Sequence, residues 1–189
     1  MNTMKHMIRM MTLALILAMA LGAAQAAQVA PPTRTDTILL EGQEESYTAT
    51  QYADENLILW YDADNFAAQP IDGGVRLQLM ENALPGEVAM EALHVGDTQA
   101  PSLARFAQEQ AALQQQGWTL TNPFEQPLAL GADPASGVIA TKDGQNVELY
   151  QFIQNGLTYQ IMLRYPAEAA EGWGARMLHF AQTINQRAE

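Results

Sequence analysis

The stretch GVIATKDGQNVELYQFIQNGLTYQIMLRYP, residues 137–166, decides the fold that this sequence predicts. Two dipeptides within it, Asp143-Gly144 and Asn155-Gly156, favour the tight turns of β-hairpins, because Asn, Asp and Gly accept the positive φ that such turns require. The runs around them are rich in β-branched and aromatic residues, which are typical of strands. We therefore expect a meander of three antiparallel strands, at about residues 137–142, 146–154 and 157–165.

The second of these turns also sets the register of its two strands. With Asn155 and Gly156 as a two-residue loop, residue 154 pairs with 157, 152 with 159 and 150 with 161, and paired residues share a face of the sheet. We expect the more apolar face to be core, and it carries Tyr150, Phe152, Leu157, Tyr159, Ile161 and Leu163. The other face is apolar enough to be partly covered, and it carries Val147, Leu149, Ile153 and Met162 among Gln151, Gln160 and Arg164.

Two amphipathic helices are expected around this meander. The first begins at Pro101-Ser102, where Ser102 can cap the free amides, and ends before Gly117. Its apolar side carries Leu103, Phe106, Ala107 and Leu113. The second follows Pro166, and its first turns are weakened by glycines at 172 and 174. Its apolar stripe, which can lie on the sheet, carries Trp173, Met177, Phe180, Ala181 and Ile184.

The N-terminal half carries shorter strand signals. Residues 37–41 and 45–52 flank Gly42 and resemble a hairpin of exposed, polar strands. Residues 57–61 are apolar throughout, as expected for a strand that is covered on both faces.

The segment between this strand and the first helix is more mixed. Residues 62–74 are rich in turn formers, and residues 75–79 then alternate apolar and polar, as in a strand with one buried face. Residues 88–95 suit a strand or a helix. Together the elements predict an α+β fold, an antiparallel sheet with amphipathic helices packed on it in an αβα sandwich-like arrangement.

The N-terminus has the features of an export signal. Lys5, His6 and Arg9 precede an apolar, uncharged run from Met10 to Leu21, which is shorter than the roughly 20 residues that a membrane-spanning helix needs. The segment Ala24-Gln25-Ala26 fits the small-x-small pattern that a signal peptidase reads. We expect cleavage after Ala26, with a retained anchor as the alternative.

Three segments result from this cut. Residues 1–26 are the signal peptide, residues 27–36 a flexible tether with two prolines, and residues 37–187 a single α+β domain. The mature part is long enough for one well-buried core. We expect it to be periplasmic or extracellular, with no transmembrane helix once the signal is removed.

Charge and cysteine content exclude several classes of function. Residues 27–189 contain seven basic and 21 acidic residues, because Lys5 and Arg9 belong to the expected signal peptide. The net charge of this part is therefore −14. Such a surface repels phosphate backbones and anionic lipids, and we expect no nucleic-acid partner. With no cysteine, the chain has no disulfide, thiolate metal site or thiol nucleophile.

The order of elements resembles the PsbP-like family, which includes exported DcrB-like bacterial proteins. The likeness is carried by residues 57–61, the 102–116 helix, the strand that ends Gln160-Ile-Met-Leu-Arg-Tyr-Pro166, and the 173–184 helix. It implies an antiparallel sheet with helices on both faces, and the role of an assembly factor, accessory subunit or binding protein without catalysis. No family motif is present that would assign functional residues.

The chain offers little for covalent or acid–base chemistry. The mature part holds only His94 and His179, and no Gly-x-Ser-x-Gly elbow that would place a serine nucleophile. We interpret both histidines as structural or surface residues. Trp60, Trp118 and Trp173 lie in or beside amphipathic elements, so we expect them to pack in the core and not to stack on a ligand.

Carboxylates leave two further hypotheses open. Asp62, Asp64 and Asp72 are weak candidates for calcium, because closely spaced carboxylates supply the oxygen ligands that this ion prefers. The match to a calcium-binding loop fails at Phe66, Ala67 and Gly73, where a ligand, the turn glycine and a glutamate belong. Two acids that converge across a cleft would instead make a small carboxylate-based hydrolase.

The function that the sequence favours is therefore a non-enzymatic one. We expect an exported binding or accessory protein of the cell envelope, without cofactor, whose partner is another envelope protein or a small ligand. The carboxylate-based hydrolase and the calcium-binding secreted domain are the alternatives.

Overall fold

The predicted meander forms the middle of the structure. Its strands are β8 (Ser136–Lys142), β9 (Gln145–Gln154) and β10 (Leu157–Pro166). Residue 154 pairs with 157, 152 with 159 and 150 with 161, which confirms the predicted register. Both turns have the positive φ that favours Asp-Gly and Asn-Gly, with φ of 50° at Asp143 and 53° at Asn155.

The computed structural model describes residues 30–81, 83–96, 99–121 and 136–185, and for residues 99–102 it describes the backbone alone. Contacts divide the chain into two units, Met1–Ala30 and Pro31–Glu189, and all the described helices and strands belong to the second unit. The predicted signal peptide, its cleavage site and the start of the tether lie outside the described residues.

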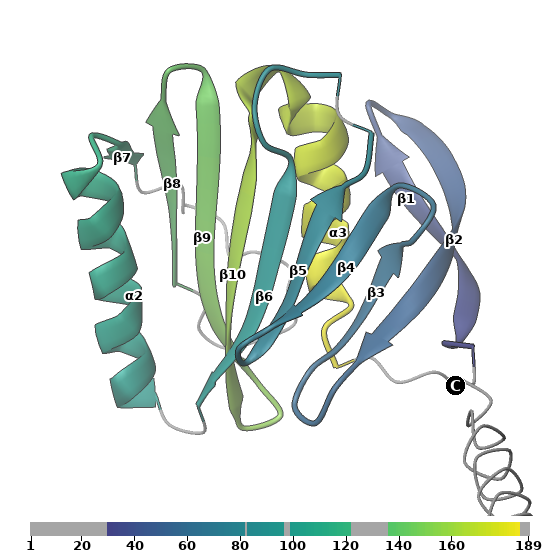
Figure 1. The fold of residues 1–189 in the computed structure, drawn as a ribbon, viewed down its shortest axis with the longest axis horizontal. Coiled ribbons are helices and arrows are strands. Elements are labelled where there is room, and N and C mark those ends of the chain that lie inside the picture. The colour runs from purple at the N-terminus through teal and green to yellow at the C-terminus, as the bar shows by residue number, and fades with distance from the viewer. Residues whose placement is uncertain (1–29, 82, 97–98, 122–135, 186–189) are drawn as a thin grey trace, which may run out of the picture. The chain divides into compact units, whose positions relative to one another are not determined.

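Seven antiparallel strands form one sheet in the order β4-β5-β6-β10-β9-β8-β7 (Figure 1). The meander is joined by β4 (Phe66–Ile71), β5 (Gly74–Leu79), β6 (Ala89–Gly96) and β7 (Thr119–Thr121). The segment that suits a strand or a helix is thus a strand, because β6 pairs with β5 on one side and β10 on the other.

One strand of this sheet differs from the sequence-based expectation. β4 lies in the segment whose residues indicated turns, and it pairs with β5 through a turn at Asp72-Gly73. Pro70, which weakens the strand signal, is tolerated because β4 is the edge strand of the sheet and a proline there breaks no ladder on a second side.

The N-terminal strands form a separate three-stranded sheet, β1-β2-β3. It consists of β1 (Thr33–Leu40), β2 (Gln43–Ala53) and β3 (Ile58–Asp62), so the predicted hairpin is present and longer than expected. Residues 33–36 belong to β1 and not to a tether. They are ordered by pairing with β2 and by the Arg34 guanidinium, 4.5 Å from the Trp60 ring centre.

Helix α2 (Gln99–Gln115) packs on one face of the seven-stranded sheet. It starts before Ser102, so Ser102 is not the N-cap, and Pro101 stands in the first turn, where a missing N–H is tolerated. Of the predicted apolar side, Phe106 and Leu113 are buried, whereas Leu103 and Ala107 are exposed. Phe106 and Leu113 are two turns apart and lie along one line of the helix.

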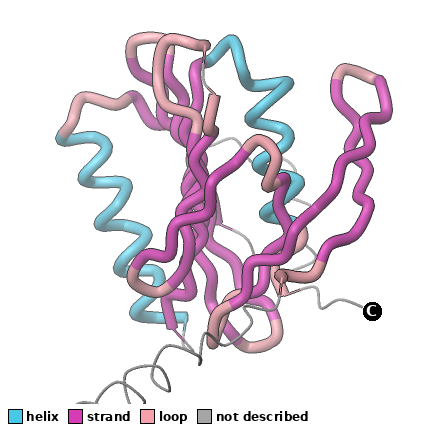
Figure 2. Tube along the Cα trace, turned by 45° about the vertical axis from the view of Figure 1, so that its right-hand side comes forward, coloured by secondary structure: helices cyan, strands magenta, loops and turns pink. Residues whose placement is uncertain are grey.

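The C-terminal helical segment packs on the opposite face, which Figure 2 shows. It comprises a 3-10 turn (Ala167–Ala169), a π-helical turn (Ala170–Gly174) and α3 (Ala175–Gln182). A Cβ at Gly174 would lie 3.0 Å from the Tyr165 ring, so a glycine permits this close packing. The cluster on this face contains most of the predicted core, namely Tyr150, Phe152, Tyr159, Ile161 and Leu163 with Met177, Phe180 and Ile184.

The second face of the meander carries a smaller cluster, as predicted. Val147, Leu149 and Met162 are buried there with Phe106 and Leu113 of α2. The fold is therefore α+β, dominated by mostly antiparallel strands and completed by helices. No helix among the described residues is long and apolar enough to span a membrane.

Candidate functional site

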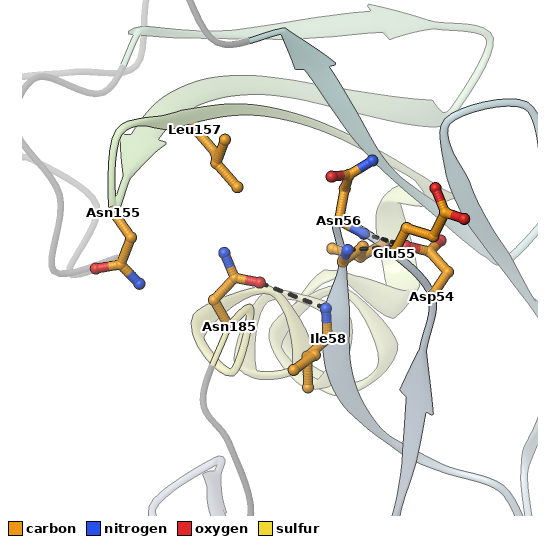
Figure 3. A pocket seen from close by; sticks show the side chains of 8 residues that line it. Asp54, Glu55, Asn56, Ile58, Asn155, Leu157 and Asn185 are labelled. Carbon is orange, nitrogen blue, oxygen red and sulfur yellow. Dashed lines mark hydrogen bonds between the residues drawn. The ribbon is translucent and has the colours of Figure 1, made fainter.

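A polar pocket of about 330 Å³ lies where three distant segments meet (Figure 3). The segments are the β2–β3 turn, the start of β10 with its hairpin turn, and the residue after the last turn of α3. They supply its lining, which consists of Asp54, Glu55, Asn56, Leu57, Ile58, Asn155, Leu157 and Asn185.

The β2–β3 turn is built by Asp54. Its Oδ1 accepts hydrogen bonds from the backbone N–H of Asn56 at 2.9 Å and of Leu57 at 2.8 Å. Its Oδ2 accepts one from the Tyr52 hydroxyl at 3.1 Å. Burial raises the pKa of Tyr52 to about 12, and the neighbouring Asp54 charge and hydrogen bond act in the same direction. The Asp54 carboxylate therefore holds the turn in shape.

Asn185 joins α3 to this turn. Its backbone N–H donates to the Ile58 carbonyl at 2.8 Å, and its Oδ1 accepts from the Ile58 N–H at 3.4 Å. Its Nδ2 donates to the hydroxyl of Tyr159, which in turn donates to the Asn56 carbonyl at 3.0 Å. Asn185 has a φ of 58°, a left-handed conformation that asparagine tolerates at a helix end.

Burial of Tyr159 keeps this chain of hydrogen bonds in one protonation state. Burial raises the pKa of its hydroxyl, the hydrogen bond from Asn185 lowers it, and the Asp54 charge raises it, with a net rise. The hydroxyl thus stays protonated at neutral pH and can donate to Asn56.

Other polar groups in the pocket remain available to a ligand. The side-chain amides of Asn56 and Asn155 make no hydrogen bond with the described residues, and the Glu55 side chain is exposed. Leu157, which is half-buried, adds apolar surface. No lysine, arginine or histidine is among the described residues that line the pocket. The pocket thus offers amide donors and acceptors beside negative charge.

The structure separates the three calcium candidates. Asp62 is the last residue of β3 and Asp64 lies in the turn that follows, whereas Asp72 lies beyond the far end of β4, about 20 Å further along the strand direction for six residues. The Asp62 carboxylate accepts from the Asp64 N–H at 3.1 Å and from the Asn65 side chain at 2.7 Å. Within the described ranges, no group of three or more His, Cys, Asp or Glu side chains could hold a metal ion.

Asp62 has a structural partner that the sequence did not reveal. It is buried, and its Oδ2 lies 3.3 Å from Nη1 of the buried Arg176 on α3. Nη2 of the same arginine lies 2.6 Å from Glu45 of β2, and its guanidinium is 5.4 Å from the Trp173 ring centre. This ion-pair cluster ties α3 to the three-stranded sheet.

His94 and His179 lie away from the pocket lining. His94, on β6, is half-buried beside the Tyr159 ring, with ring centres 5.8 Å apart. His179, on α3, has its Nε2 3.5 Å from Oδ2 of Asp36. Burial alone would raise the pKa of Asp36, but the hydrogen bond from Arg34 and the charges of His179 and Arg34 hold it below its usual value.

The tryptophans divide into one core residue and two half-buried ones. Trp60 is 1% exposed, which confirms its expected core position. Trp173 is half-buried and contacts the ring of Phe66 edge-on, with ring centres 5.6 Å apart. Trp118 is half-buried and packs against the cluster on the α2 side of the sheet.

None of the polar residues of the pocket is singled out as a site by the sequence. Asn155 is recognisable there only as a turn former, Asn185 follows the last residue of the predicted apolar stripe, and residues 54–56 lie between two predicted strands. Asn and Asp do mark turns and helix ends, which is the available signal. Nothing local indicates that three such points meet.

No family model matches the chain, and a comparison with curated proteins finds no significant match.

Proposed function

We propose that this chain is an exported, non-enzymatic binding or accessory protein of the cell envelope, and that the polar pocket takes a small ligand rich in hydroxyl or amine groups. The observation that carries the proposal is that Asn56, Asn155, Asn185 and Glu55, from three distant segments, all line one pocket. Its volume falls within the range of small-molecule sites.

The ligand class follows from the lining. A side-chain amide can donate and accept hydrogen bonds at once, which suits hydroxyl groups, and carboxylates accept from hydroxyl and ammonium groups. Because no described cationic side chain lines the pocket, an anionic ligand would meet the charges of Asp54 and Glu55 without a compensating cation. We therefore favour neutral polyols, sugars and amines over phosphates and carboxylates.

The same geometry supports binding more than hydrolysis. A carboxylate-based hydrolase needs two acids that flank the scissile bond with different protonation states. Asp54 is engaged by Tyr52 and two backbone N–H groups, and Glu55 is its direct neighbour in the chain. Asp54 would have to release the turn in order to react.

The binding test is a calorimetric screen of the exported chain against monosaccharides, amino sugars and short polyamines. For any compound that binds, Asn56→Ala should weaken binding by about tenfold, the value of one lost hydrogen bond to a strong partner. Asn56 offers its side chain without tying the turn, so this variant should keep the fold. Gln114→Ala, at an exposed position of α2, is the control.

Glu55→Gln then separates the ligand types. An amine should lose affinity with the charge, whereas a neutral sugar should retain it. If no compound of these classes binds, or if the Asn56 variant binds as tightly as the unaltered chain, the pocket is not the binding site that we propose.

Export is a separate part of the proposal, supported by the leader sequence. When the full chain is produced in a bacterium, the mature protein should leave the cytoplasm and begin at Ala27. Intact mass measurement of the envelope and medium fractions checks this. An unprocessed chain retained in the cytoplasm would contradict it.

We also propose that the fold is an αβα sandwich-like member of the PsbP-like group. The packing of α2 and α3 on opposite faces of the seven-stranded sheet supports this layering. An experimental structure that aligns over the whole sheet with a PsbP-like protein would test the kinship.

A further inference from the structure

A second pocket, of about 320 Å³, lies on the α2 side of the seven-stranded sheet. It is lined among others by Trp118, Val147, Arg164, Glu87 and Gln145. Arg164 of β10 pairs with Val147 of β9, so both side chains belong to the face that α2 covers in part. The walls thus combine an indole ring and an apolar side chain with a guanidinium.

The positive charge of this pocket has no carboxylate partner within the described ranges. Arg34, Arg76 and Arg176 each form an ion pair with an acidic residue. None of the ion pairs formed by the described residues involves Arg164, whose Nη2 lies 2.9 Å from the sulfur of Met162.

Glu87, which also lines the pocket, does not supply the missing partner. Its carboxylate pairs with Arg76, which also pairs with Glu91 on β6. The Glu87 carboxylate is therefore held in an ion pair by Arg76, which is not among the residues that line the pocket. In a chain with 21 acidic residues, a half-buried arginine that forms no ion pair with a described carboxylate is a candidate anion-binding group.

One wall of the pocket is held in place by its neighbours. The Gln145 side chain donates to the Pro85 carbonyl at 2.9 Å. Gly86 has a φ of 127°, a conformation that favours glycine, and it passes close to the end of the Gln145 side chain. The wall beside Arg164 is therefore a built surface rather than a loose side chain.

We propose that this pocket is a second binding site, which takes a small carboxylate with an aromatic body. The planar guanidinium of Arg164 can bind a carboxylate through two parallel N–H···O bonds. The half-buried Trp118 offers the flat, apolar contact that an aromatic ring prefers. This ligand is anionic, whereas the ligands that we favour for the first pocket are neutral or cationic. The two pockets should therefore not compete for the same compound.

The test is the binding of indole-3-acetate to the exported chain by isothermal titration calorimetry, with indole-3-acetamide as the neutral analogue. The acid should bind at least about tenfold more tightly than the amide, because only the acid forms charge-assisted hydrogen bonds with Arg164. An acid that does not bind, or binds no better than its amide, overturns the proposal.

Variants then locate the site. Arg164→Gln should remove the preference for the acid, whereas Arg105→Gln, at an exposed position of α2, should retain it. Asn56→Ala should leave the binding of indole-3-acetate unchanged, since it alters the other pocket. A preference for the acid that survives in Arg164→Gln also overturns the assignment. Should this variant fold poorly, the comparison of acid and amide on the unaltered chain still decides.

Discussion

A single buried hydroxyl joins the last helix to the three-stranded sheet. Thr183, at the C-terminal end of α3, is 3% exposed, and its Oγ1 accepts from the Trp60 N–H at 2.9 Å. The same hydroxyl donates toward the Phe180 carbonyl at 2.6 Å. Without the hydroxyl, the buried Trp60 N–H would lose this acceptor.

Thr183→Val should therefore destabilise the protein by about 1–3 kcal/mol, the cost of an unsatisfied buried donor. Valine has nearly the same shape, so packing is retained. Thr183→Ser keeps the hydroxyl and is the matched control. Urea unfolding followed by circular dichroism measures both, and equal stabilities of the valine and serine variants would contradict the role of this hydrogen bond.

Arg176 is the other residue on which the position of α3 depends. Arg176→Met leaves the buried Asp62 charge without its cation, and we expect a loss of about 3 kcal/mol in the free energy of unfolding, measured by urea titration. Arg105→Met, at an exposed position, should change it by less than about 0.5 kcal/mol. If charge compensation is the reason, adding Asp62→Asn to Arg176→Met should recover part of the loss.

At the scale of elements, the β9–β10 hairpin depends on its turn glycine. Gly156 has a φ of 79°, and no atom lies within 4 Å of the position that a Cβ would take. A substitution there is thus opposed by backbone conformation and not by packing.

Gly156→Ala should lower the thermal midpoint, with a loss of about 1–2 kcal/mol for a left-handed alanine. Gly172→Ala is the matched control, because Gly172 also has free space but no positive φ. That substitution should be neutral or stabilising, since alanine restricts the unfolded chain more than glycine does. A similar loss in both variants would show that the turn conformation is not the cause.

The elements of the C-terminal half were predictable because their signals are local. Asp143-Gly144 and Asn155-Gly156 specify turns, and an alternating pattern between such turns leaves only one register that buries the aromatic face. β4 was not predictable for a related reason. Pro70 is a strand breaker by local rules, and only its position at the edge of the sheet makes it acceptable.

At the scale of the whole molecule, the fold raises the pKa of every tyrosine. Burial raises the pKa of all six tyrosines, and for Tyr150 and Tyr165 the nearby Glu148 charge raises it further. For Tyr52, the pKa rises from 10.0 to about 12, and this is the smallest of the large rises. The folded protein therefore keeps protons that the unfolded chain releases above about pH 10.

The sign of the pH dependence is set by the direction of these shifts. Stability from the raised tyrosine pKa values is fully present below about pH 10 and is lost as the pH rises through the folded values. For buried Tyr165, the loss is at most about 1.4 kcal/mol for each pH unit. Urea unfolding at about pH 9 and about pH 11 measures the drop, which Tyr165→Phe should reduce. Equal drops in both proteins would contradict the raised pKa.

The sequence by itself determined the acidity, the absence of thiols, the α+β class, the register of β9 with β10 and the apolar faces of the meander. The first two are properties of the composition. The others depend on turn residues and on the alternation of apolar and polar residues, which can be read between near neighbours in the sequence. The two pockets and the ion pair that joins α3 to β3 depended on the tertiary structure. Asn185 reaches Ile58, 127 residues away, and Arg176 reaches Asp62, 114 residues away. Such partners are chosen by how the helices and sheets pack, which no local pattern specifies.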